Sequence, residues 1–203
     1  MIMAVAIPCS KPRASRETVI EALISQKLWS NDRVTRCSVI GCRGYYRDTM
    51  GRPGVNDRSI YDDAAFVLSP DIFESFNFNT DPHGWKRGRA TLESRQRVVY
   101  VAGYHGYGRA TGHPAFRQAS DVVVLRDGRV GNGTNLGGGR FRDRASSRFW
   151  INLHRGGSVT TSSAGCQTVP PDQWPSFHDL VLSELNKWGQ SNFSYYLIDG
   201  PIT

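Results

Sequence analysis

The chain has 203 residues, of which 39% are hydrophobic and 21% charged, and no stretch approaches the roughly 20 apolar residues of a membrane span. This composition is ordinary for a soluble globular protein, and the 21 glycines and 11% aromatic residues favour a strand-rich architecture over a helical bundle. The formal net charge of +7 suits an anionic partner, such as nucleic acid, a membrane surface or a bacterial envelope polymer.

The length predicts one domain over residues 1–203, which begins with a flexible segment at 1–14. The apolar run in that segment has no basic region before it, so it makes a poor signal peptide. Ser15 has the residue type of a helix N-cap, and apolar residues at three- and four-residue spacing predict a helix up to Trp29. A strand at 35–46 and a turn-rich loop follow.

Apolar runs and strict alternation predict the other strands. These strands are 64–69, 73–79, 98–104, 122–125, 149–153 and 193–198. Residues 126–148 are rich in glycine and arginine, and we expect them to form a mobile loop. An apolar stripe that starts at Gln173 predicts the second helix. The predicted fold class is therefore α+β, mainly β, with a helix near each end.

His154 and Cys166, twelve positions apart, form a candidate catalytic pair. A cysteine attacks carbonyls as the thiolate, so it needs a neighbouring base or positive field that lowers its pKa. The small residues before Cys166 predict a tight turn in which the Gly165–Cys166 backbone forms an oxyanion hole. Ser162, Ser163 or a backbone carbonyl would orient the imidazole. The alternative is a core thiol and a structural histidine, and the two residues alone leave both open.

The stretches Ile151–Gly157 (INLHRGG) and Thr161–Val169 (TSSAGCQTV) resemble the His and Ser-x-Gly-Cys signature of the L,D-transpeptidase (YkuD-like) superfamily. They resemble more closely a group of phage and prophage proteins described as peptidoglycan-degrading endolysins. Further segments of the chain share this second resemblance, which runs from about residue 17 to the end. These segments are 56–70, 76–82, 104–106 and 192–197.

The resemblance implies an L,D-transpeptidase-like β-sandwich or barrel in which Cys166 is the nucleophile, His154 the base, and Gly165 and Ser163 complete the catalytic turn. The chain departs from the transpeptidase pattern in three ways. The separation of His154 and Cys166 is at or below the short end of what is usual there. Ala164 stands where a second histidine is usual, and Gln167 follows the cysteine where an apolar residue is usual. These departures favour hydrolysis of the stem peptide or cross-link through an acyl-enzyme over transfer to a second peptide.

Four residues are candidates for substrate binding. We expect Arg155 and His105 to position the carboxylates of the substrate, Gln167 to offer its side-chain amide, and Tyr104 to line the groove. His105 is also a candidate to replace the missing second histidine. The alternatives are a turn histidine, a capping glutamine and a packing tyrosine.

The hypothesis is a phage-type endolysin that needs no metal or organic cofactor. It would be a monomer, made in the host cytoplasm, released with a holin, and active on peptidoglycan in the periplasm or cell wall. The alternatives are a non-catalytic envelope-binding or virion structural protein on the same fold, and a zinc-dependent amidase that uses His83, His113 and His154. A nucleic-acid-binding protein is disfavoured, because residues 126–148 contain a single aromatic, Phe141.

Overall fold

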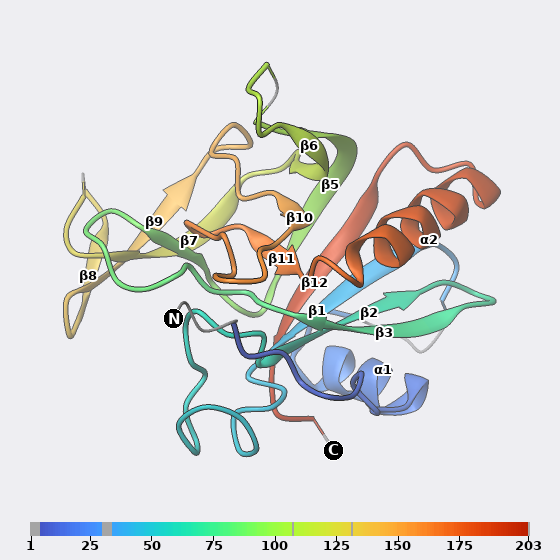
Figure 1. The fold of residues 1–203 in the computed structure, drawn as a ribbon, viewed down its shortest axis with the longest axis horizontal. Helices are drawn as coiled ribbons and strands as arrows, with labels where there is room; N and C mark the ends of the chain where they lie inside the picture. Colours follow the sequence, from blue (N-terminus) through green and yellow to red (C-terminus); the bar gives the residue numbers. More distant parts are fainter. Residues whose placement is uncertain (1–4, 30–33, 107, 131, 203) are drawn as a thin grey trace.

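The computed structural model describes residues 5–29, 34–106, 108–130 and 132–202. In these ranges it has few helices and many strands, so the predicted class, α+β and mainly β, is confirmed (Figure 1). In chain order the elements are α1 (Arg16–Ser25), β1 (Ser38–Arg43), β2 (Asp63–Leu68), β3 (Phe73–Phe78), β4 (Ala90–Leu92), β5 (Gln96–His105), β6 (His113–Gln118), β7 (Val122–Asp127), β8 (Thr134–Gly137), β9 (Arg140–Ala145), β10 (Leu153–Arg155), β11 (Gln167–Val169), α2 (Trp174–Lys187) and β12 (Phe193–Asp199).

The main sheet has eight strands in the order β11-β10-β6-β5-β12-β1-β2-β3. Its pairs are antiparallel except β1 with β12 and β10 with β11. Its two edges also meet, since Asn79, just after β3, exchanges two backbone hydrogen bonds of 2.9 Å with Thr168 of β11. The sheet is therefore a nearly closed barrel, which leaves little unpaired edge at β11, the strand that follows the candidate cysteine.

A helix covers each side of the sheet at β1 and β2, as Figure 1 shows. Neighbouring residues of β1 therefore belong to different apolar clusters: Ile40 lies in the cluster that includes Leu23 of α1, and Val39 in the one that includes Phe177 of α2. Burial on both faces explains why these strands have near-continuous apolar sequences. The predicted N-cap is confirmed, because the Ser15 side chain accepts the Thr18 N–H at 3.2 Å.

The prediction of a loop at 126–148 is wrong. The segment contains the end of β7 and the strands β8 and β9, which pair with one another and with β4 in a second sheet. Two of its arginines pair with acidic side chains, Arg126 with Asp143 of β9 at 2.6 Å and Arg142 with Glu93, just after β4, at 2.8 Å. The sequence pattern does not indicate β8 and β9, because most of their side chains are exposed and neither strand has an apolar face.

Other boundaries also differ from the predictions. The first helix ends at Ser25 rather than Trp29, because the chain leaves it through Lys27 in a left-handed conformation. The predicted strand at 149–153 is replaced by β10, so His154 lies within a strand rather than after one. The segment 5–14 has no regular structure, yet hydrogen bonds tie it down, such as the one from the Val5 N–H to the Ser158 carbonyl at 2.9 Å. Residues 1–4 lie outside the described ranges.

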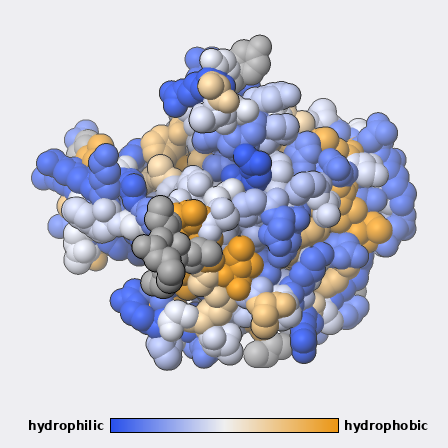
Figure 2. All heavy atoms as spheres, viewed as in Figure 1, coloured by the Kyte–Doolittle hydropathy of each residue, from blue (hydrophilic) through white to orange (hydrophobic). Residues whose placement is uncertain are grey.

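Neither helix in the described ranges has the length and apolarity that crossing a membrane requires. The face shown in Figure 2 is mostly hydrophilic, with apolar residues in small groups.

Candidate active site

The pairing of β10 with β11 brings His154 and Cys166 together. His154 lies opposite Thr168 in this parallel pair, and Cys166 immediately precedes β11. The turn before the cysteine requires glycine, because Gly165 has φ +144° and a Cβ there would collide with the Ala90 carbonyl oxygen. Cys166 itself is only 8% exposed.

Ser163 braces this turn and does not contact the histidine. Its hydroxyl donates to the Cys166 carbonyl at 2.7 Å and accepts the Gly165 N–H at 3.0 Å. The Gly165 N–H is therefore engaged, so the expected oxyanion hole loses one of its two backbone donors. The Cys166 N–H is the donor that this turn leaves for an oxyanion.

A backbone carbonyl orients His154, one of the three alternatives that the sequence left open. The His154 Nδ1 lies 2.7 Å from the Arg155 carbonyl oxygen. Since a carbonyl can only accept, Nδ1 carries the ring proton and Nε2 keeps its lone pair. This Nε2 is buried and has no hydrogen-bond partner within the described residues. It is therefore free to accept a proton.

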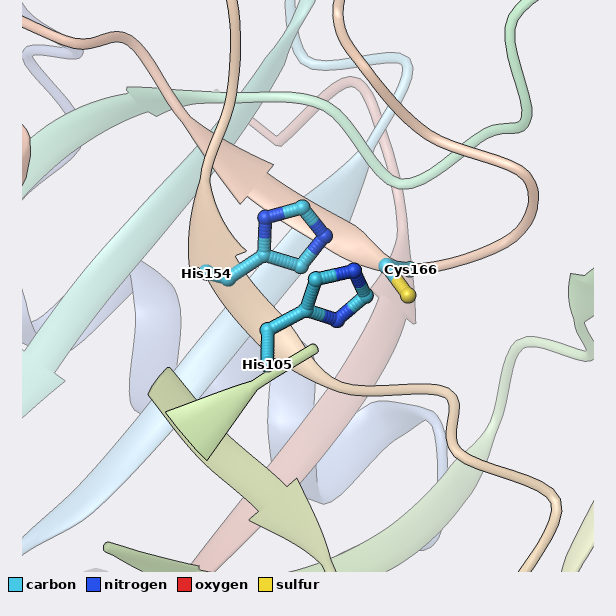
Figure 3. A group of neighbouring side chains, drawn as sticks. All are labelled: His105, His154 and Cys166. Carbon is cyan, nitrogen blue, oxygen red and sulfur yellow. The ribbon is translucent and has the colours of Figure 1, made fainter. Parts of the chain in front are cut away.

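His105, at the end of β5, lies against His154 with ring centroids 4.2 Å apart and an angle of 24° between the planes. Its Nδ1 is 3.2 Å from the Asn152 Nδ2, which can only donate. The His105 proton therefore lies on Nε2. The two stacked histidines thus hold opposite tautomers, one with an acceptor and one with a donor at Nε2. Figure 3 shows both rings extending toward Cys166.

His113 is a third histidine at the site, which sequence reasoning placed only in a zinc alternative. It lies opposite His105 in the β5–β6 pair, and its Nε2 is 3.3 Å from the His154 Nδ1. Its own Nδ1 is 3.0 Å from the Thr111 carbonyl oxygen, so its Nε2 is the acceptor. The Arg155 carbonyl oxygen and the His113 Nε2 both accept at the His154 Nδ1, so both favour a proton on that nitrogen. The short hairpin between the two histidines was the signal that could have indicated their proximity.

Burial shifts the pKa values of Cys166, His154 and His105 toward their uncharged forms. It raises the pKa of Cys166 to about 11, although a backbone hydrogen bond from Asn152 partly opposes it. Burial also lowers the pKa of His154 to about 3, with the neighbouring His105 adding to the effect. The pKa of His105 is lowered by burial and by His113. The Cys166 side chain is therefore a neutral thiol and not a thiolate in this state, because desolvation outweighs the nearby groups.

The remaining predicted substrate-binding residues lie in different places. Gln167 is fully buried, and its amide oxygen accepts the Tyr195 hydroxyl at 2.9 Å, so it belongs to the core. Arg155 is exposed and follows His154 on β10, so its side chain points to the opposite face of the sheet. Tyr104 is half exposed and lines a cavity together with His105.

Two cavities meet at Trp150, a residue with φ +67° whose carbonyl oxygen lies 3.5 Å from the Cys166 Sγ. The larger, of about 320 Å³, is lined by Tyr104, His105, Gly106, Arg109, Arg117, Trp150 and Asn152. The smaller, of about 150 Å³, is lined by Gly88, Ala90, Phe149, Trp150, Ile151, Ala164, Gly165 and Cys166. The thiol therefore opens onto a small cavity beside a larger basic one.

Within the described residues, one group of three side chains could hold a metal ion. His105, His154 and Cys166 each offer a donor atom, and these atoms lie within 4.8 Å of one another. His83 and His113, the other expected zinc ligands, do not belong to this group.

Comparisons with known proteins do not identify a family for this chain. No family model, no curated protein and no solved structure matches this chain. The resemblance to phage endolysins and to the YkuD-like signature therefore stays a hypothesis.

Proposed function

We propose that the protein is a cysteine hydrolase of the endolysin type, in which Cys166 attacks a peptide carbonyl and His154 acts as base and then as acid. The observation that carries this proposal is the buried, unpartnered Nε2 of His154 beside the thiol, with the opposite ring nitrogen fixed on the Arg155 carbonyl. A histidine that served packing alone would leave a buried acceptor unsatisfied at a cost of about 1–3 kcal/mol.

The reaction would begin from a neutral thiol. As the substrate carbonyl reaches Sγ, the His154 Nε2 takes the thiol proton and the carbon–sulfur bond forms. The oxyanion would accept hydrogen bonds from the Cys166 N–H and the Nε2–H of His105. His154 then protonates the leaving amine. A water molecule that loses its proton to His154 hydrolyses the thioester and restores the thiol.

We propose the peptide part of peptidoglycan as the substrate. The net charge of +7 and the two arginines at the larger cavity suit the carboxylates of stem peptides. The resemblance of the His154–Cys166 segment to endolysins points to the same polymer. As an endolysin, the protein would be made in the host cytoplasm and reach the cell wall after a holin opens the membrane.

The test is release of soluble muropeptides from purified sacculi in the presence of EDTA. We expect the wild type to release them, and Cys166→Ala and His154→Gln to be slower by at least about 10²-fold. Cys9→Ala, which removes an exposed cysteine, is the matched control and should keep the wild-type rate. A Cys166→Ala protein as active as the wild type would exclude the nucleophile. Loss of wild-type activity in EDTA would favour a metal-dependent hydrolase instead.

A further inference from the structure

The group of His105, His154 and Cys166 has a feature that proton transfer alone does not use. Three different donor atoms, two imidazole nitrogens and one sulfur, lie within 4.8 Å of one another. In a tetrahedral zinc site with bonds of about 2.0–2.3 Å, such atoms lie roughly 3.3–3.6 Å apart. The side chains would therefore need to move together by roughly 1 Å.

Surrounding groups already hold His154 as a metal ligand requires. Histidine ligands commonly donate their second ring N–H to a carbonyl, which fixes the ring and the tautomer. The Arg155 carbonyl accepts the Nδ1–H of His154 at 2.7 Å. His154 as a whole is 2% exposed, and its other ring nitrogen, Nε2, is buried without a hydrogen-bond partner in the described residues. This orphaned nitrogen, aimed into the cluster, is the independent sign of a ligand (Figure 3).

We propose that this cluster binds one Zn²⁺ through Cys166, His154 and His105, and that the bound ion masks the nucleophile. Two imidazoles and a thiolate form a donor set that zinc favours, and the fourth position would take water from the 150 Å³ cavity at Cys166. The masking part rests on the proposed hydrolase function: a thiolate held in a zinc–sulfur bond is a poor nucleophile, and a coordinated Nε2 cannot accept a proton.

The proton balance is defined. The Cys166 thiol loses its proton to solvent when the zinc–sulfur bond forms. The His105 proton moves from Nε2 to Nδ1, where Asn152 must turn its amide so that the oxygen accepts it, giving up the Gln118 N–H at 3.3 Å. Zinc binding therefore releases one proton from the protein, which calorimetry in buffers of different ionisation enthalpy measures directly.

The test uses the full-length protein and Co²⁺ as a spectroscopic probe. We expect one equivalent of Co²⁺ to produce a near-ultraviolet thiolate-to-metal absorption band, which Zn²⁺ displaces. Cys166→Ser should abolish the band, and His105→Gln should weaken Co²⁺ affinity by at least about 10-fold. Cys9→Ala is the control and should leave the band unchanged. No band, or a band that survives Cys166→Ser, would overturn the site.

A second readout avoids substitutions. Zn²⁺ should slow iodoacetamide labelling of Cys166 in the wild type, while the exposed Cys9 of the same molecules reports the labelling rate without a site. Equal labelling of Cys166 with and without Zn²⁺ would also overturn the proposal.

The two proposals can fail separately. A Co²⁺ band in a protein that never releases muropeptides would leave the metal site and reject the hydrolase. Muropeptide release by a protein that binds no Co²⁺ would leave the hydrolase and reject the metal site. Muropeptide release that increases with Zn²⁺ would reject masking, because the ion would then serve the reaction.

Discussion

At the residue scale, the site depends on where two protons lie. The Arg155 carbonyl keeps the His154 proton on Nδ1, and the Asn152 amide leaves the His105 proton on Nε2. Two stacked rings of the same residue type therefore present an acceptor and a donor to one thiol. The proposed division of roles, with His154 as the base and His105 as the oxyanion donor, is based on these two contacts.

The charge state of the cluster predicts a flat pH profile. Because the pKa of His154 is lowered to about 3 and that of Cys166 raised to about 11, the thiol and imidazole stay neutral between these values. We expect kcat/KM to vary little between about pH 5 and 9. An acid limb with a midpoint near pH 6.5 would contradict this, since it would show that His154 titrates as an ordinary histidine.

Arg117 is predicted to bind the substrate, a role that sequence reasoning gave to Arg155. Its Nε is buried and without a hydrogen-bond partner in the described residues, and its guanidinium carbon lies 5.0 Å from the centre of the Trp150 ring. Arg117→Ala should raise KM about 10-fold or more and change kcat less, measured on soluble muropeptides. Arg95→Ala, which removes an exposed pair with Asp199, is the control. An unchanged KM in Arg117→Ala would remove the cavity from substrate binding.

At the element scale, the turn before β11 determines where the thiol lies. Two features require a glycine at position 165. Its φ of +144° is rarely adopted by other residues, and a Cβ there would collide with the Ala90 carbonyl oxygen. Gly165→Ala should therefore destabilise the fold by about 2–4 kcal/mol in urea unfolding. The exposed neighbour offers a control, since Ala164→Gly should cost less than about 1 kcal/mol. Equal stability of the two variants would show that the turn adapts.

The elements differ in how far the sequence predicts them. The strand β2 and the helix α2 were predicted, because each buries a continuous apolar run or stripe. The strands β8 and β9 were not, because the residues of β8 are all exposed and β9 has arginines and ion pairs in place of an apolar face. The strands β10 and β11 have three residues each, and they depend on pairing with distant segments that no local pattern records.

The same limit applies to the site. The spacing of His154 and Cys166 and the small residues between them indicated the pair and its turn. The places of His113 and Arg117 follow from the register of β5 with β6, where His113 faces His105 and Arg117 faces Val101. Register is set by pairing across the sheet, so the sequence pattern alone could not show that His113 lies beside His154 or that Arg117 lines the cavity at His105.

At the scale of the whole molecule, buried carboxyl groups predict how stability depends on pH. Burial raises the pKa of Asp62 and that of Asp63, with the neighbouring carboxyls adding to the effect. The unfolded chain loses these protons near pH 4, so the folded state is favoured below that pH. This contribution is lost as the pH rises through the raised pKa values of the two carboxyls in the folded state.

Asp62→Asn should therefore flatten the fall of the unfolding free energy as the pH rises above about 6.5. The lowered pKa of His154 acts only below pH 6.5, so it does not interfere in this window. Urea unfolding at several pH values measures the effect, and Asp71→Asn, at an exposed carboxylate paired with Lys187, is the control. Parallel pH curves for Asp62→Asn and the wild type would show that Asp62 titrates normally.

The central claim is a covalent acyl-enzyme on Cys166. The most direct measurement is mass spectrometry of the protein quenched early in its reaction with a defined muropeptide, followed by peptide mapping. We predict a mass increase equal to the acyl part of the cleaved peptide, located on Cys166, absent from Cys9 and absent altogether in Cys166→Ala. Muropeptide cleavage by the wild type with no adduct at any time, and at the same rate in Cys166→Ala, would contradict the account.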